Sequence, residues 1–315
     1  MTISTWLNRV RMQLSVYGPV SGSAAMVRSL WSGVAHRLSA LSPGGGTNVY
    51  ERDWDLLVLL DACRVDALEA VADEYAFLPD TVPSLRSVAP NSELWLERTF
   101  TSEHEREIAC TTYVTANGHA DGFYDGSFEV DVGQFRTIDP VYEYGFDESA
   151  GTIPPRPVTD AAIRRFREDP PERGVVHYMQ PHTPYRVLDL DGIGERDGKA
   201  FRETVWDWIA AGRLSREEAW EYYLDNLRWV LDDVAVLLEN VDADHVIVSA
   251  DHGEAFGEWG AYGHSAHGEF EGLRRVPWAR TTATDRETHE PEMAPAKEDS
   301  DDVDIEEQLE YLGYR

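Results

Sequence analysis

The chain has 315 residues, 42% of them hydrophobic, so it can bury a large core and is too apolar to be disordered throughout. It carries 58 acidic and 28 basic residues, a net charge of -30, and its only lysines are Lys199 and Lys297. Acid excess spread along the chain, with few lysines, is typical of halophilic proteins that stay soluble in concentrated salt. It argues against nucleic acid as a partner, because nucleic acids bind basic faces.

Cysteines and apolar runs exclude two further classes. Cys63 and Cys110 stand at unrelated positions, which indicates neither a disulfide framework nor a cysteine zinc site. No apolar run approaches the roughly 20 residues of a transmembrane helix. The N-terminal part lacks the compact apolar segment of a signal peptide, so we expect a cytoplasmic protein.

Residues 1–46 form a separate N-terminal segment that ends in three glycines. Its arginines stand among scattered apolar residues, which predicts a helical segment. Two interpretations remain open: weak contact with a membrane surface, or packing on the main domain.

Along residues 47–284, apolar strands alternate with helices, which we interpret as one main domain. We predict strands at 54–60, 174–179 and 245–250, and helices at 62–72, 93–100 and 158–168, with two more between 201 and 240 that break near Gly212. The second of that pair opens with a capping box, Ser215 to Glu218. This alternation predicts an α/β fold with a mostly parallel central sheet and helices on both faces.

The last part of the chain changes in composition. Residues 285–304 are acidic and contain prolines, which predicts a mobile linker. Residues 305–315 have apolar side chains at helical spacing, and we expect a short helix that docks back on the domain.

Potential metal ligands follow each of the three predicted strands. Asp61 follows the first, His182 the second, and Asp251 with His252 the third. Because the carboxyl ends of parallel strands meet at one edge of a sheet, we expect these side chains to converge. Alone, each would be as readily a helix cap or a structural histidine, but together carboxylate and imidazole ligands predict a divalent metal site.

The segment from Asp251 to His264 is the most specific feature of the chain. It reads Asp-His-Gly-Glu-Ala-Phe-Gly-Glu-Trp-Gly-Ala-Tyr-Gly-His. Its glycines let the backbone fold back, so that His264 faces the same point as Asp251 and His252. Near the first ligand, Arg64 has three open roles: it stabilises the loop after Asp61, faces an anion, or forms a surface pair with Asp66.

Ser92 is our candidate nucleophile because it stands where the helix at 93–100 begins. Helix N-terminal amides favour an alkoxide or a bound anion, and a metal lowers the pKa of a hydroxyl further. A serine before Glu93 also suits a helix cap. The alternative nucleophiles are Ser87, Thr99 and Thr101.

In this order, Asp61, Ser92, the run from His177 to Tyr185 and the Asp-His-Gly-Glu segment resemble the alkaline phosphatase/sulfatase superfamily. The likeness is greatest to its sulfatase-like and phosphoethanolamine-transferase branch. The resemblance implies an alkaline phosphatase-like three-layer sandwich and makes residues 47–284 a catalytic domain. It also implies that the catalytic metal is held by Asp61, Ser92, Asp251 and His252.

The resemblance further implies that His182 and His264 contact the substrate group or hold a second metal. Two features of the relatives are missing. The classical sulfatase pattern Cys-x-Pro-x-Arg does not occur around Cys63 or Cys110, which argues against a formylglycine mechanism. A membrane anchor like that of the transferases is not predicted either.

We therefore expect a metal-dependent hydrolase or transferase that acts on a phosphate mono- or diester through Ser92. In this hypothesis His182 and His264 bind the transferred group, ligate metal or protonate the leaving oxygen. Zn or Mn suits the ligands best, with Ca or Mg as alternatives, and one or two ions. The substrate would be a small-molecule, glycan-linked or lipid-linked ester.

Two alternatives remain open. One is hydrolysis of a sulfate ester at the same site. The other is a non-catalytic metal-binding scaffold, which a buried Ser92 far from Asp251 would favour.

Overall fold

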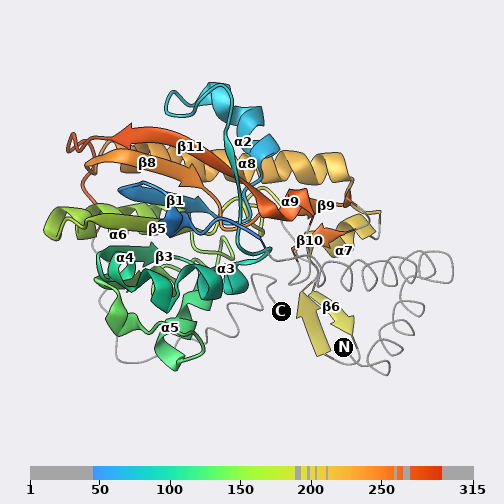
Figure 1. Cartoon of the computed structure of the whole chain (residues 1–315). Coiled ribbons are helices and arrows are strands. Elements are labelled where there is room, and N and C mark those ends of the chain that lie inside the picture. The colour runs from blue at the N-terminus through green and yellow to red at the C-terminus, as the bar shows by residue number, and fades with distance from the viewer. Residues whose placement is uncertain are drawn as a thin grey trace.

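The computed structural model describes residues 45–188, 193–196, 199–202, 204–210, 212–258, 261–264 and 270–292 (Figure 1). The N-terminal segment up to residue 44, the predicted linker from residue 293 and the predicted C-terminal helix lie outside the described residues. Among the helices of the described part, none has the length and apolar character that a membrane crossing requires.

A seven-stranded sheet forms the centre of the fold, in the order β2-β11-β8-β1-β5-β3-β4. The strands from β8 to β4 run parallel to their neighbours, whereas β11 runs antiparallel to both β8 and β2. The predicted mostly parallel sheet is therefore confirmed. The strands are β1 (Leu56–Leu60), β2 (Ser84–Arg86), β3 (Thr111–Thr115), β4 (Thr137–Pro140), β5 (Arg173–Tyr178), β8 (Ala243–Ser249) and β11 (Arg275–Ala283).

Helices cover both faces of this sheet, as two adjacent residues of β5 show. Successive side chains of a strand point to opposite faces. The ring of His177 packs against Trp95 of α3 (Ser92–Thr99), with centroids 6.1 Å apart. The hydroxyl of Tyr178 lies 2.8 Å from that of Thr159 in α6 (Pro155–Glu168). Helices α3 and α6 therefore lie on opposite faces, which confirms the prediction.

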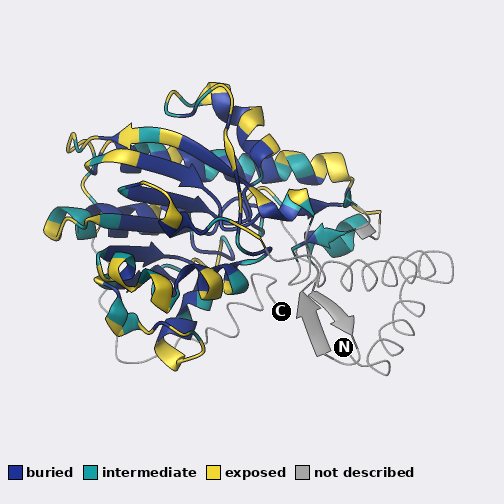
Figure 2. Ribbon diagram, viewed as in Figure 1, coloured by how far each residue is buried: buried dark blue, intermediate teal, exposed yellow. Residues whose placement is uncertain are grey.

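On the α6 side, α8 (Arg216–Leu238) packs against both α6 and α2 (Val65–Val71). In Figure 2 the central strands are mostly buried, whereas exposed residues lie on the helices, the loops and part of β11. The smaller elements of the described part are α4 (Glu105–Ala109), α5 (Gly122–Asp125), α7 (Val205–Ala210), α9 (Glu271–Arg274), β6 (Ile193–Arg196), β7 (Lys199–Arg202), β9 (Ala255–Phe256) and β10 (Tyr262–Gly263).

Two predicted helices begin later than expected. The helix expected from residue 201 begins at Val205, because Thr204 and Asp207 cap its start: Asp207 N donates to Thr204 Oγ1 (3.2 Å) and Thr204 N donates to Asp207 Oδ2 (3.0 Å). The helix expected from residue 62 begins at Val65, because Ala62 has a left-handed backbone with φ of 62°. The capping box of Ser215 is confirmed.

Residues 285–292, the first part of the predicted linker, lie against α6. Asp285 pairs with Arg167 at 2.8 Å, and His289 Nε2 lies 2.6 Å from Asp160 Oδ1. These contacts connect the segment after β11 to the α6 face of the domain.

Candidate active site

The predicted metal ligands converge at the carboxyl edge of the parallel strands. β1 lies between β5 and β8, so the residues that follow these strands are neighbours. Ligand atoms of Asp61, Asp251 and His252 all lie within 4.8 Å of one another, and all three side chains are buried. We call these three residues the first cluster. Its geometry follows from the strand order, because each residue directly follows β1 or closely follows β8.

Ser92 joins the first cluster. Its Oγ lies 3.4 Å from Asp61 Oδ2 and 3.2 Å from His252 Nε2. The helix cap is Asn91 instead, whose side chain accepts a hydrogen bond from Leu94 N at 3.0 Å. Asn91 therefore fills the capping role that the sequence left open for Ser92, and the Ser92 hydroxyl faces the cluster.

The alternative nucleophiles are placed differently. The Ser87 hydroxyl donates to the main-chain oxygen of Asp251 and accepts from Ala89 N. Thr99 lies at the opposite end of the eight-residue helix α3, and Thr101 follows it. Of the four candidates, Ser92 has the geometry expected of a nucleophile at this site.

The turn after β1 brings a backbone donor into the site. Ala62 N–H donates to Asp251 Oδ1 at 3.2 Å, and His252 N–H donates to the same oxygen at 2.9 Å. The left-handed backbone of Ala62 costs roughly 1–2 kcal/mol for a residue other than glycine. This strained turn joins the ends of β1 and β8 through the Asp251 carboxylate.

Two neighbouring residues that the sequence analysis missed support the carboxylates. Asn117, which follows β3, donates from Nδ2 to Asp61 Oδ2 at 3.0 Å. His177 Nε2 lies 3.7 Å from Asp251 Oδ2, and its Nδ1 lies 2.9 Å from the Tyr113 hydroxyl. Burial lowers the pKa of His177 to about 4, so its ring is neutral at pH 7. An Asn-Gly pair after a β-branched run was the available signal for Asn117.

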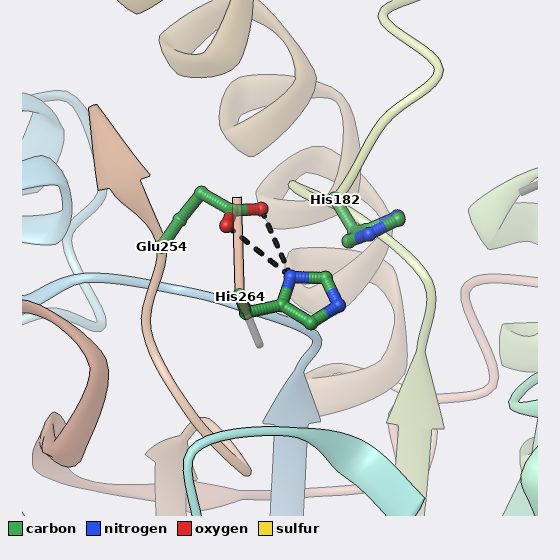
Figure 3. Close-up of side chains that lie close together, drawn as sticks. All are labelled: His182, Glu254 and His264. Carbon is green, nitrogen blue, oxygen red and sulfur yellow. Dashed lines mark hydrogen bonds and ion pairs between the residues drawn. The ribbon is translucent and has the colours of Figure 1, made fainter. Parts of the chain in front are cut away.

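A second cluster adjoins the first and consists of His182, Glu254 and His264 (Figure 3). His264 Nδ1 lies 3.2 and 3.3 Å from the two carboxylate oxygens of Glu254. The ring centroid of His264 is 4.9 Å from that of His182 and 4.4 Å from that of His252. The structure thus brings both predicted histidines to the site and adds Glu254, whose signal was its place in the Asp-His-Gly-Glu segment.

Hydrogen bonds assign the tautomers of the histidines. His252 Nδ1 donates to the Gly253 carbonyl at 2.8 Å, and His182 Nδ1 donates to the Thr183 carbonyl at 2.6 Å. His264 Nδ1 faces the Glu254 carboxylate in the same way. The lone pair therefore resides on Nε2 of each neutral ring, the arrangement found in histidines that ligate metals.

Burial shifts the pKa values of the histidines and of Glu254 in opposite directions, and both shifts favour the neutral form. It lowers the pKa of His182 to about 3 and that of His264 to about 4, and it also lowers the pKa of His252. It raises the pKa of Glu254 to about 7. For Asp251, burial raises the pKa, but the adjacent His252 and His177 together with hydrogen bonds such as that from Ala62 N–H outweigh it, so the pKa of this carboxylate lies below its usual value.

The first cluster fits a divalent cation. Within the described residues, Asp251 Oδ2 has no hydrogen-bond donor, although it is buried and ionised. It lies beside a second buried carboxylate, Asp61, and such a pair repels unless a cation neutralises it. Two carboxylates, an imidazole and a hydroxyl form a donor set that suits Zn or Mn.

Comparisons with known proteins match no family model and no curated protein. Among solved structures, the chain is similar to the integral membrane lipooligosaccharide phosphoethanolamine transferase A of Neisseria meningitidis (16% identity, TM-score 0.47), over 74% of this chain and 48% of that one. It is also similar to the C-terminal periplasmic domain of EcEptC from Escherichia coli, in complex with Zn (14% identity, TM-score 0.47), over 72% of both chains.

A third similar structure is a protein in the alkaline phosphatase superfamily from Vibrio parahaemolyticus, with 15% identity and a TM-score of 0.39. This likeness covers 86% of this chain and 71% of that one. The chain spans about half the length of the membrane transferase. All three TM-scores are below 0.5.

Proposed function

We propose that the chain is a metal-dependent enzyme that hydrolyses or transfers a phosphate mono- or diester through Ser92. The observation that carries this proposal is the position of Ser92 Oγ, 3.4 Å from Asp61 and 3.2 Å from His252. Asp61, Ser92, Asp251 and His252 would hold a divalent ion. When bound, such an ion acts as a Lewis acid that lowers the pKa of a hydroxyl and neutralises phosphoryl charge.

The residues themselves supply the remaining parts of the reaction. Ser92 Oγ donates to Asp61 Oδ2, so the serine proton has an acceptor beside it. Ser92 would attack phosphorus while the bond to the leaving alcohol breaks, and the N-terminal amides of α3 would stabilise the negative charge. His182 and His264 would bind the transferred group and exchange a proton with the leaving oxygen. Water or an acceptor hydroxyl would then release the phosphoryl group from Ser92.

Burial controls access to this site. The side chains of Asp61, Ser92, Asp251 and His252 are all 0% exposed. An ester therefore reaches Ser92 only after a rearrangement around the site. The same burial excludes water, which strengthens every electrostatic interaction with the reacting group.

The two alternative functions have less support. A formylglycine sulfatase needs the pattern Cys-x-Pro-x-Arg, or the same pattern with serine first, but Ser92 is followed by leucines at the positions of the proline and the arginine. The Cys63 thiol is directed to the Arg64 carbonyl at 3.6 Å. Cys110 follows α4, outside both clusters. A non-catalytic scaffold predicts that Ser92 is buried and distant from the ligands. Ser92 is buried, but it contacts Asp61 and His252, which favours catalysis.

The test is a turnover panel in molar KCl with Zn or Mn, because salt screens the charge of -30. The substrates are an aryl phosphate, an aryl phosphodiester and an aryl sulfate. Wild type is compared with Asp251→Asn and with Asp233→Asn, which removes a buried carboxylate that pairs with Arg156 on the α6 face.

Three outcomes separate the hypotheses. Turnover of a phosphate ester that is lost in Asp251→Asn and kept in Asp233→Asn supports the proposal. Turnover of the sulfate ester alone supports the sulfatase alternative. Metal binding without turnover of any ester contradicts the proposed activity on these substrates and favours the scaffold.

A further inference from the structure

Arg64 belongs to the loop that leaves β1 just after Asp61, and it is the N-cap residue of α2. Its guanidinium is held by Asp66 of α2 through two hydrogen bonds, Nε to Oδ1 at 2.8 Å and Nη2 to Oδ2 at 2.7 Å. Asp66 is a near neighbour in sequence, so this contact orients the guanidinium without joining distant parts of the chain.

The remaining nitrogen of Arg64 reaches the hairpin of β9 and β10. Nη1 donates to the Glu254 carbonyl at 2.8 Å and to Glu258 Oε1 at 2.7 Å. The other oxygen of Glu258 accepts from Phe256 N at 2.7 Å. The guanidinium also lies 5.4 Å from the ring centroid of Trp220 and 6.0 Å from that of Phe256.

This hairpin carries the second cluster. Glu254 directly precedes β9, and in the strand pair Ala255 lies opposite Gly263, which directly precedes His264. One guanidinium therefore connects the loop of Asp61 with the strand pair that sets both Glu254 and His264. The Arg64 side chain is only 13% exposed, so salt screens these contacts less than those of a surface pair.

We infer that Arg64 is a positioning residue, which fixes Glu254 and His264 relative to Asp61 and Ser92. The sequence left open whether Arg64 pairs with Asp66 or stabilises the loop after Asp61. In the structure it does both, since the pair with Asp66 orients the guanidinium that stabilises the loop. A lysine cannot replace it, because an ammonium group cannot bond Asp66 through two nitrogens and also reach Glu258. The effect of Arg64 on kcat rests on the proposed function, whereas its effect on the stability of the hairpin does not.

The test compares Arg64→Lys and Glu258→Gln with a matched control. Arg167→Lys weakens an ion pair of similar geometry at Asp285, with two bonds of 2.8 Å, on the α6 face. With an aryl phosphodiester and bound metal, Arg64→Lys and Glu258→Gln should lower kcat about 10–100-fold. The control should keep the wild-type kcat, and all three variants should keep the metal.

Amide hydrogen exchange supplies a readout that needs no activity. In Arg64→Lys and Glu258→Gln, the amides of Ala255, Phe256 and Gly263 should exchange faster, whereas those of α6 should not. Wild-type exchange and kcat in Arg64→Lys would overturn the inference. An equal loss of kcat in Arg167→Lys would also overturn it, because the effect would then be general destabilisation.

The inference and the proposed function fail in different ways. If wild type turns over no ester, the proposed function fails, and faster exchange confined to the hairpin in Arg64→Lys still supports the positioning contact. If wild type is active and Arg64→Lys matches it in both measurements, only the inference fails.

Discussion

Replacing Ser92 with alanine separates a nucleophile from a buried structural hydroxyl. The change removes two long contacts, to Asp61 at 3.4 Å and to His252 at 3.2 Å, while Asp61 keeps its hydrogen bond from Asn117. The free energy of unfolding should therefore fall by only about 1 kcal/mol. If Ser92 carries the phosphoryl group, kcat should fall at least ~10⁴-fold, or about 5 kcal/mol of activation free energy.

The two effects are measured separately, by urea unfolding and by steady-state turnover of an aryl phosphodiester. Thr111→Val on β3 is the matched control, since it also deletes a fully buried hydroxyl. That hydroxyl contacts the Tyr50 hydroxyl and the Glu107 carbonyl. This control should lose similar stability and keep its kcat. Quenched wild-type reactions should contain phosphoserine at Ser92 by mass spectrometry. A Ser92→Ala variant that retains more than about a tenth of kcat would refute covalent catalysis by this residue.

Three further predictions concern metal binding, the hydrogen bond of Asn117 to Asp61, and the pH dependence of stability. Chelation should lower the unfolding temperature of wild type but not of Asp251→Asn, because a metal at 100 times its Kd contributes about 2.7 kcal/mol; scanning fluorimetry measures this, and equal shifts would contradict it. Asn117→Ala should weaken metal affinity about 10–100-fold, because Asp61 loses its amide donor; competition with a metal-binding dye tests this, and unchanged affinity would exclude the role. In metal-free protein, wild type should lose stability as pH falls from 6.5 to about 4, because burial lowers the pKa of folded His177 and the unfolded chain binds more protons. His177→Gln should lose less stability over this range. Urea unfolding at several pH values should give a smaller slope of unfolding free energy against pH for the variant, and equal slopes would disprove it.

The elements that the sequence predicted best are those with a local signal. β1 is a continuous apolar run, and β5 and β8 each contain a shorter one, which is typical of strands covered on both faces. The start of α8 was also local, because the capping box at Ser215 and Glu218 satisfies backbone groups within one turn.

Elements whose burial depends on distant neighbours were missed. β3 reads Thr-Thr-Tyr-Val-Thr and looks half-polar, yet all five residues are buried between β4 and β5. β11 pairs antiparallel with β8, and no local pattern distinguishes that direction from a parallel one. Because these strands were missed, Asn117 at the end of β3 had no predicted place at the site.

The sequence by itself determined which residues follow the strands and so predicted Asp61, His182, Asp251, His252 and His264 as one group. Tertiary structure alone decided the distances, because the order of the strands places β1 between β5 and β8. It also decided that Asn91 rather than Ser92 caps α3, that Glu254 faces His264, and that Arg64 bonds the hairpin. The contacts of Ser92 with His252 and of Arg64 with the hairpin join residues far apart in the chain, and their geometry follows from packing, which no local run of residues encodes.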